Sequence, residues 1–294
     1  MKGFAKTLQD NIKLIKNYEI ASLFFTEIKK EIIVSEKMYG SVDAEQLKNY
    51  YQYSSKSEAN FKYSRHRYAD TTQFLIHNIK KDYKVLDAGC GVGSESILCS
   101  LIGGSVIGID ISNRLDVAKK RISYYEDRFN ATLNIDFLQK SVFDHSGKYD
   151  LIWVNEAISH IHPAERFFQI AYKNLRKNGI LLISDGNNLN PKIFINAKMS
   201  QKRRGGMVST KKNLNTGKLI PYAHERKFSV FEIRNISSKL FKFENLYYIG
   251  YLPSLFFNKF PKFSRFIEDE VVKKMVLIKI LAGGYIIKLI KRSD

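Results

Sequence analysis

Cysteine is nearly absent from this chain of 294 residues, which contains only Cys90 and Cys99. Two cysteines cannot provide a disulfide framework, and no Cys/His cluster has the spacing of a zinc site. We therefore expect no bound metal, and a reducing compartment, the cytoplasm, as the location.

Long apolar segments are missing as well. The first twenty residues, MKGFAKTLQDNIKLIKNYEI, have lysines spread through them and no continuous apolar core, which argues against a signal peptide. The longest apolar stretch, Met275–Ile290, is interrupted by Lys279 and Lys288, so no segment is expected to span a membrane. These absences predict a soluble protein or one that lies on a membrane surface.

Acidic residues are too few to balance the basic ones. The chain has 48 Lys and Arg against 29 Asp and Glu, a net charge of +19. The segment Asn188–Lys227 has ten basic residues against the single acid Glu225. Such a segment attracts anionic partners, such as phosphorylated glycans, lipid headgroups or nucleic acid. A lysine-rich solvated surface is the alternative interpretation.

The segment Val85–Ser96, VLDAGCGVGSES, is the most informative part of the chain. It indicates a short apolar strand, then Asp87, then glycines at 89, 91 and 93, which let the backbone turn tightly and point N–H groups at a ligand. The third glycine comes one place too early for the dinucleotide fingerprint, and Asp87 would repel a pyrophosphate. No G-K-[ST] follows, which excludes a P-loop. The loop therefore predicts a nucleotide ligand with positive charge near Asp87.

A second acidic residue ends the next predicted strand. Val106–Ser112, VIGIDIS, places Asp110 twenty-three positions after Asp87. An acid at the tip of the second strand of a βαβ unit accepts both hydroxyls of a ribose. The two carboxylates thus predict the two ends of one ligand site.

With these motifs the chain resembles the class I S-adenosylmethionine-dependent methyltransferases, with a methyltransferase type 11/25-like domain. Asp87–Gly93 is similar to the first motif of that family, and Gly108–Asp110 to its acidic second-strand motif. Lys148–Ile161 resembles the fourth-strand motif, and Leu175–Ser184 the turn and fifth strand. The resemblance is strong over Thr71–Asn187.

The pattern from Thr71 onward alternates strands and helices. This alternation predicts a three-layer, Rossmann-like α/β fold with a mostly parallel sheet. The expected strands are Lys84–Asp87, Ser105–Ile109, Leu133–Gln139, Tyr149–Val154, Gly179–Ser184 and Phe243–Tyr251. The resemblance implies a final antiparallel strand at Tyr285–Ile290 after a helix ending near Leu281, whereas an amphipathic membrane helix over Val271–Ile290 is the alternative.

Three parts of the chain are distinguished. Residues 1–70 are expected to form a helical extension or cap, with helices over Lys2–Lys37 and from Asp43, which would be the capping residue. Residues 71–294 would form the methyltransferase domain, with a helix beginning at Thr71. Residues 188–227 are too long for an ordinary connection, so we expect a basic, substrate-facing insertion or lid.

The resemblance implies S-adenosyl-L-methionine as the cofactor. Asp87 would lie near its amino group, and Asp110 would hold the ribose. Ser141 stands where family members often have Asp, so its hydroxyl or the Val142 backbone would contact the adenine. The predicted cofactor-binding residues are Asp87, Gly89, Cys90, Gly91, Asp110, Ile111, Ser141, Val142, Asn155 and Glu156.

His160 is the predicted catalytic residue. Relatives that methylate oxygens often have E-x-x-x-H after the fourth strand, and His160 aligns with that histidine. A neutral imidazole can take a hydroxyl proton near neutral pH, although a packed or helix-capping histidine is the alternative. The same loop lacks [DN]-P-P-[FYW], and no Pro-Cys pair occurs, so nucleic acid is not expected as the acceptor.

We therefore expect O-methylation of a glycan, a lipid or a lipid-linked small molecule, with an anionic acceptor. The net charge favours RNA methylation as one alternative. The basic, aromatic tail, with phenylalanines among lysines, favours a non-catalytic membrane-surface protein as another, or peripheral contact of the enzyme with the inner membrane face. The sequence does not indicate an oligomeric state.

Overall fold

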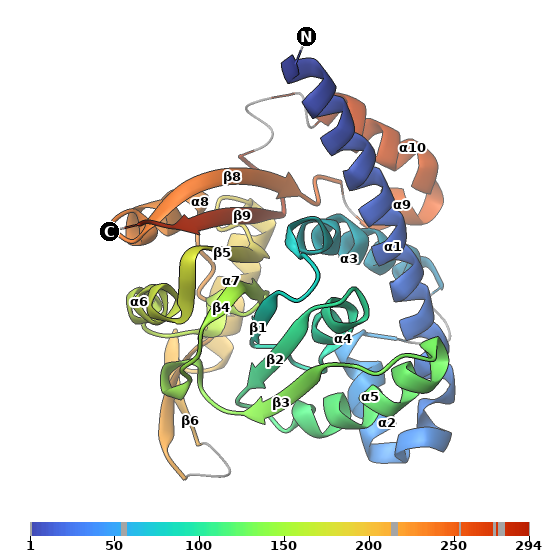
Figure 1. The fold of residues 1–294 in the computed structure, drawn as a ribbon, viewed down its shortest axis with the longest axis vertical. Helices are drawn as coiled ribbons and strands as arrows, with labels where there is room; N and C mark the ends of the chain where they lie inside the picture. Colours follow the sequence, from blue (N-terminus) through green and yellow to red (C-terminus); the bar gives the residue numbers. More distant parts are fainter. Residues whose placement is uncertain are drawn as a thin grey trace.

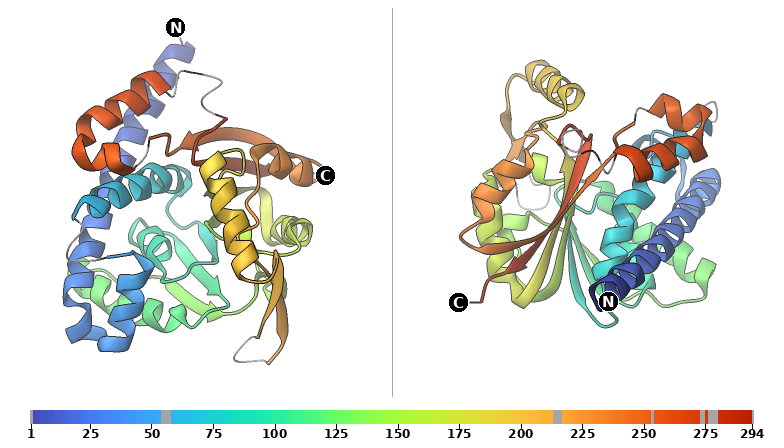
Figure 2. Two further views of the ribbon diagram at one scale, coloured as in Figure 1. Left: turned by 180° about the vertical axis from the view of Figure 1, so that it is seen from behind. Right: turned by 90° about the horizontal axis from the view of Figure 1, so that it is seen from above.

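The computed structural model describes residues 2–53, 58–212, 217–252, 254–272, 275 and 280–293. A seven-stranded sheet with the order β3-β2-β1-β4-β5-β9-β8 lies between two layers of helices (Figures 1 and 2). Its strands are β1 Lys84–Ala88, β2 Ser105–Asp110, β3 Ile135–Gln139, β4 Tyr149–Asn155, β5 Leu175–Gly186, β8 Phe241–Ile249 and β9 Gly284–Lys291. The helices are α1 Lys2–Tyr39, α2 Ser41–Tyr50, α3 Glu58–Asn78, α4 Ser94–Leu101, α5 Arg114–Phe129, α6 Ala164–Asn174, α7 Pro191–Arg203, α8 Val230–Ser237, α9 Ser254–Lys259 and α10 Pro261–Phe266.

The first five strands are parallel, and β9 is inserted antiparallel between β5 and β8. The inner strands are buried apolar runs, as sheets covered on both faces require. The predicted Rossmann-like fold is confirmed, including its last antiparallel strand. The alternative membrane helix is wrong, because Gly284–Lys291 pairs with both neighbouring strands. The expected helix before that strand falls largely on residues outside those described.

The N-terminal helices share a core with α4 and α5. Phe24, Phe25 and Ile28 of α1 lie in one buried cluster with Ile97 of α4 and Tyr125 of α5. In Figure 1, α1 crosses the outer side of this helical layer. The division at residue 70 stays a prediction, since α3 runs across that position.

Two expected helix starts differ from the structure. A helix beginning at Thr71 is wrong, because α3 is continuous from Glu58. Asp43 is not a capping residue, because α2 begins at Ser41. Gly40 precedes it, and the φ of 84° at Gly40 separates α2 from α1. Asp43 instead lies in the first turn, where its carboxylate pairs with Lys120.

The basic segment 188–227 folds into α7 followed by a hairpin of β6 Val208–Lys212 and β7 Leu219–Ala223. The Asn190 side chain caps α7 by accepting from the Ile193 N–H at 3.1 Å. A bridge between Ile161 and Tyr222 joins the hairpin to the loop after β4. The hairpin therefore lies beside the carboxyl ends of the strands, although its role as a lid stays a prediction.

The C-terminal part adds α9 and α10, followed by a π-helical turn η3 at Ile267–Val271. Glu268 is buried and accepts the N–H groups of Tyr251 and Leu252 at 2.9 and 2.8 Å. The other carboxylate oxygen of Glu268 lies 3.2 Å from Nε2 of His66 on α3. This contact anchors the C-terminal part of the chain to the N-terminal helices. None of the helices that the structure describes is long and apolar enough to cross a membrane.

Candidate functional site

The glycine loop after β1 adopts a conformation that its three glycines require. Gly89, Gly91 and Gly93 have φ values of 84°, 55° and 78°, which side chains rarely adopt. A Cβ at Gly89 would lie 2.6 Å from Cβ of Ala157, a distance that real atoms do not tolerate. The loop is therefore pressed against the loop that follows β4.

Two carboxylates, Asp87 and Glu95, lie beside this loop. Asp87 is buried and accepts the Ser96 hydroxyl at 2.6 Å, and Glu95 accepts the Asn155 amide at 3.1 Å. Among the described residues, neither forms an ion pair. Burial, and then the nearby Glu95, raises the pKa of Asp87 to about 8, and burial also raises the pKa of Glu95. This donor set fits a cationic ligand, because a nearby positive charge would relieve the cost of the buried carboxylates.

Asp110, at the end of β2, is oriented by the backbone. Its Oδ2 accepts the Gly91 N–H at 3.0 Å, and its Oδ1 accepts the Ser112 N–H at 2.8 Å. The strand register places Asp87 opposite Gly108, so both acids lie at the same edge of the sheet. Ile111 follows Asp110 and is partly exposed. The ribose contact of Asp110 stays a prediction, as does the cofactor contact of Ile111.

Two tyrosines that the sequence analysis did not identify cover the glycine loop. A Cβ at Gly91 would lie 3.0 Å from the Tyr50 ring and from its hydroxyl. The Tyr51 hydroxyl bonds Oγ of Ser94 at the start of α4. The Arg114 guanidinium lies 5.4 Å from the Tyr50 ring centroid. Only the aromatic run YYQY hinted at these residues, and no motif connects it with the loop.

The predicted adenine end lies after β3. Ser141 is buried, and its Oγ accepts the Phe143 N–H at 3.2 Å, which caps the short 3-10 helix η1 Val142–Asp144. The hydroxyl still has its proton to donate. Cys90 is buried in the loop nearby, and burial raises the pKa of its thiol well above the usual range. Adenine contacts at Ser141 and Val142, and the cofactor role of Cys90, stay predictions.

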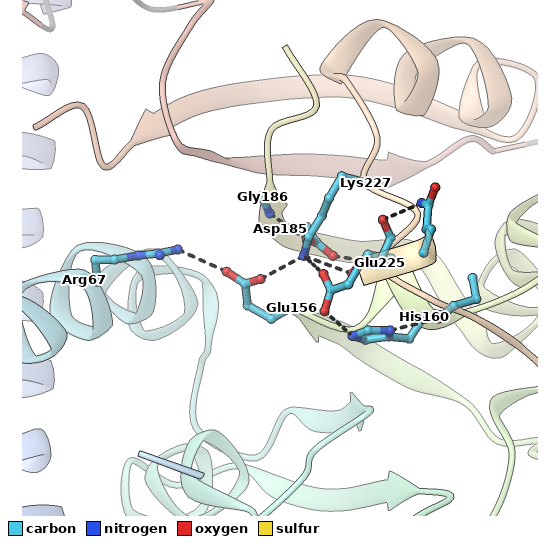
Figure 3. A network of polar contacts seen from close by, with 10 residues as sticks. Arg67, Glu156, His160, Asp185, Gly186, Glu225 and Lys227 are labelled. Atoms are coloured by element: carbon cyan, nitrogen blue, oxygen red, sulfur yellow. Dashed lines mark hydrogen bonds and ion pairs between the residues drawn. The ribbon is translucent and has the colours of Figure 1, made fainter. Parts of the chain in front are cut away.

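The loop after β4 brings Glu156 into a network of charges (Figure 3). Its φ of 50° is unusual for a residue with a side chain. Its carboxylate lies 3.1 Å from Nη2 of Arg67 on α3 and 3.3 Å from Nζ of Lys227. Asn155 points instead toward Glu95. Both residues lie at the site edge, and their cofactor contacts stay predictions.

His160 ends a 3-10 turn, η2 Ile158–His160, beside the hairpin. Its Nδ1 lies 3.0 Å from the carbonyl oxygen of Ala223, and its Nε2 lies 3.5 Å from Oε1 of Glu225. Its ring stacks on Tyr222 with a centroid distance of 5.0 Å and an interplanar angle of 8°. The side chain is 27% exposed, so a ligand can reach it.

Lys227 is the centre of the same network and was missed from the sequence. Its Nζ lies 2.6 Å from Oδ1 of Asp185 and 3.1 Å from Oε2 of Glu225, and its side chain is 10% exposed. Burial lowers the pKa of Lys227, but the Asp185, Glu156 and Glu225 carboxylates outweigh it and raise that pKa. Lys227 therefore stays charged and holds the carboxylate that faces His160.

Comparison with known proteins identifies the family of this chain. Residues 61–239 match the family described as a methyltransferase domain. The ubiquinone biosynthesis O-methyltransferase of Pelagibacter ubique is 31% identical over 125 residues, which are 38% of this chain and 50% of that protein. The malonyl-[acyl-carrier protein] O-methyltransferase 1 of Ilyobacter polytropus is 24% identical over 147 residues, 49% of this chain and 53% of that protein. The chain thus spans about half the length of these curated relatives.

Solved structures share the fold. The magnesium protoporphyrin IX methyltransferase of Synechocystis PCC 6803, with bound SAH, aligns with a TM-score of 0.53 and 15% identity, covering 89% of this chain and 100% of that one. A SAM-dependent methyltransferase of Methanosarcina mazei aligns with a TM-score of 0.52 and 16% identity, covering 75% of this chain and 98% of that one. With its match over 61–239, this chain belongs to the methyltransferase-domain family, and it has the fold of the class I S-adenosylmethionine-dependent methyltransferases.

Proposed function

We propose that this enzyme methylates a hydroxyl group of a small-molecule acceptor and that His160 accepts the hydroxyl proton. The arrangement of the His160 ring carries the proposal. The Ala223 carbonyl can only accept a hydrogen bond, so Nδ1 of His160 carries a proton. In the neutral ring Nε2 is then the basic nitrogen, and it is the nitrogen that faces Glu225.

Glu225 supports proton transfer to Nε2. At 3.5 Å from Nε2, its carboxylate stabilises the positive charge that His160 acquires when it takes a proton. Lys227 holds the other oxygen of Glu225 at 3.1 Å, which fixes the carboxylate in this position. Proton acceptance by a positioned histidine contributes about 10²- to 10⁴-fold to the rate of such reactions.

The other site residues bind and orient. S-adenosylmethionine, when bound, supplies a methyl group on a sulfonium centre. Asp87 and Glu95 provide negative charge for the cationic ligand, and Asp110 lies on the neighbouring strand for the ribose. Tyr50 lies over Gly91 of the glycine loop. Holding the nucleophile in line with the methyl group in a dry site is the main requirement of this chemistry.

The test compares His160→Ala with His162→Ala, a control two positions along the same loop. Labelled S-adenosylmethionine is incubated with the small-molecule fraction of a cell extract, and methyl transfer is measured beside cofactor affinity. We expect His160→Ala to lose about 10²-fold or more of the rate while its cofactor affinity is unchanged. An equal rate in His160→Ala and the wild type would remove His160 from this role, and absence of cofactor binding by the wild type would contradict the whole proposal.

A second function, attachment of the enzyme to a membrane surface, is favoured by one observation. Phe256, Phe260, Phe263 and Phe266 of α9 and α10 are 50%, 59%, 62% and 57% exposed. Lys259 and Lys262 lie exposed among them. Exposed aromatic groups with neighbouring cations suit an anionic lipid surface. We therefore propose a cytoplasmic enzyme with peripheral contact to the inner membrane face, whereas RNA methylation is supported by the net charge alone.

A further inference from the structure

We infer that the end of α7, the β6–β7 hairpin and the start of α5 form a phosphate-binding site for the acceptor, made by Arg204, Lys211 and Arg114. This inference rests on the proposed function, because it specifies what the acceptor carries. Lys211 on β6 places its Nζ 3.6 Å from the centroid of the Tyr222 ring. That ring stacks on His160. The ammonium group therefore lies one aromatic ring away from the proposed proton acceptor.

The fold places the other two cations beside the same site. Arg204 directly follows α7, four residues before β6, and Arg114 lies 5.4 Å from the centroid of the Tyr50 ring, which covers Gly91. Burial lowers the pKa of Lys211; Asp110 opposes this shift, and Arg114 and Arg204 add to it. The same two arginines also oppose the rise that burial causes in the pKa of the Tyr222 hydroxyl. Within the described part of the chain, neither arginine nor Lys211 forms an ion pair. Because like charges at close range are unfavourable, such a cluster suits a bound anion.

The anion belongs to the acceptor rather than to the cofactor. Asp87 marks the end of the site where a cationic amino group is expected, and Asp110 marks the ribose end. Lys211 interacts with Asp110, so the cluster lies toward the ribose end, where the cofactor has no charged group. A charged group on the acceptor is the remaining ligand that these cations can bind beside His160.

A phosphate matches the cluster better than a carboxylate. A phosphate group carries about −1.5 to −2 charges near neutral pH, and guanidinium groups bind it through paired hydrogen bonds. Two carboxylates, Asp110 and Glu225, also act on this region, and Glu225 is paired with Lys227. The three cations therefore leave an excess of positive charge that suits a multiply charged group. Figures 1 and 2 show the hairpin and the α9–α10 region at opposite ends of the molecule, which favours a soluble phosphorylated metabolite over a lipid headgroup.

The experiment measures binding of radiolabelled inorganic phosphate by equilibrium dialysis at constant ionic strength, with and without excess S-adenosylhomocysteine. Lys211→Gln is compared with Lys212→Gln, which removes the same charge from the adjacent residue of β6. Arg204→Gln is compared with Arg203→Gln in the same way. We expect at least a tenfold weaker phosphate affinity for Lys211→Gln and Arg204→Gln, and less than a twofold change for the two controls.

Equal phosphate binding by Lys211→Gln and Lys212→Gln would overturn the inference, as would equal affinity of the wild type for acetate and phosphate. Circular dichroism and titration with S-adenosylmethionine show whether each variant is folded. If the wild type binds phosphate as expected but no S-adenosylmethionine, the proposed function fails and the phosphate site does not. Flotation with phosphatidic acid vesicles shows whether the bound phosphate belongs to a lipid or to a soluble molecule. Loss of flotation in Lys211→Gln but not in Lys212→Gln would indicate a lipid phosphate. Equal flotation of the two variants, together with selective phosphate binding, would indicate a soluble one.

Discussion

Arg121 of α5 and Glu31 of α1 form a two-point ion pair with no exposure of either side chain. Nε of Arg121 lies 2.7 Å from Oε1 of Glu31, and Nη2 lies 2.8 Å from Oε2. The Tyr125 hydroxyl donates to the same carboxylate at 2.8 Å, and Nη1 of Arg121 donates to the Val92 carbonyl at 2.6 Å. The pair therefore joins α1 to the helix start that follows the glycine loop.

Glu31→Gln is expected to destabilise the protein strongly, because it leaves the Arg121 charge buried without its partner. Breaking one half of a buried pair costs about 3–5 kcal/mol in free energy of unfolding. The matched control is Glu27→Gln, which removes ion pairs with Lys30 and Arg128, whose side chains are 53% and 47% exposed. Its expected loss is below about 1 kcal/mol. Urea unfolding measures both, and equal losses would show that α1 is not held by this pair.

Cofactor affinity is expected to depend on pH through Asp87. With a pKa of about 8 in the ligand-free protein, the Asp87 carboxyl is mostly protonated at pH 7, whereas a cationic ligand requires the carboxylate. Binding of S-adenosylmethionine should therefore release a proton below pH 8, and the affinity should rise as the pH approaches 8. Calorimetry in buffers of different ionisation enthalpy measures this proton release.

The stability of the ligand-free protein should change in the opposite direction. The carboxyl of Asp87 has a pKa of about 8 when folded and 3.8 as its reference value, so the folded state binds more protons between these values. Its contribution to stability is complete below pH 4 and is lost as the pH rises to 8. Asp87→Asn should abolish this pH dependence, and an unchanged slope in that variant would contradict the assignment.

Sequence reasoning placed residues correctly in the fold where the pattern lies in neighbouring residues. The glycine loop, Asp87 and Asp110 lie on consecutive βα units, and parallel pairing brings the ends of such strands together. The sequence pattern alone therefore predicts that these residues lie at one edge of the sheet.

The rest of the site depends on contacts that no local pattern encodes. Arg121 and Glu31 are 90 positions apart, and Lys227 reaches Glu156 across 71. Tyr50 lies over Gly91 because α1 and α2 pack against α5, not because of any motif. Helix ends were also misplaced at Thr71 and Asp43, because tertiary packing continued one helix and a glycine started the other.

Gly89→Ala is expected to disrupt the cofactor site, and Gly40→Ala provides an unusually close control. Both glycines have a φ of 84°, a backbone conformation that strains an alanine at either position. At Gly89 the new Cβ would also lie 2.6 Å from Cβ of Ala157, whereas nothing lies within 4 Å at Gly40. We expect both variants to lose about 1–3 kcal/mol of stability from the backbone alone.

The difference between the two variants isolates the steric contact. Gly89→Ala must move the loop after β4, so its affinity for S-adenosylmethionine should fall by at least tenfold, while Gly40→Ala should bind as the wild type does. Titration calorimetry on both proteins measures this difference. Equal affinities would mean that the glycine loop tolerates a side chain and does not form the cofactor site.

Phe263→Glu is expected to weaken binding to anionic vesicles if α9 and α10 lie on a membrane. Full burial of a phenylalanine contributes about 1.5–3 kcal/mol, so losing one from the contact should reduce the bound fraction by about tenfold or more. Phe231→Glu on α8 is the control, because its side chain is 60% exposed, close to the 62% of Phe263, but lies on a different helix. Flotation with phosphatidylglycerol vesicles measures the bound fraction. Equal losses in the two variants would show that the phenylalanines of α9 and α10 have no special part in the association, and absence of flotation by the wild type would exclude it.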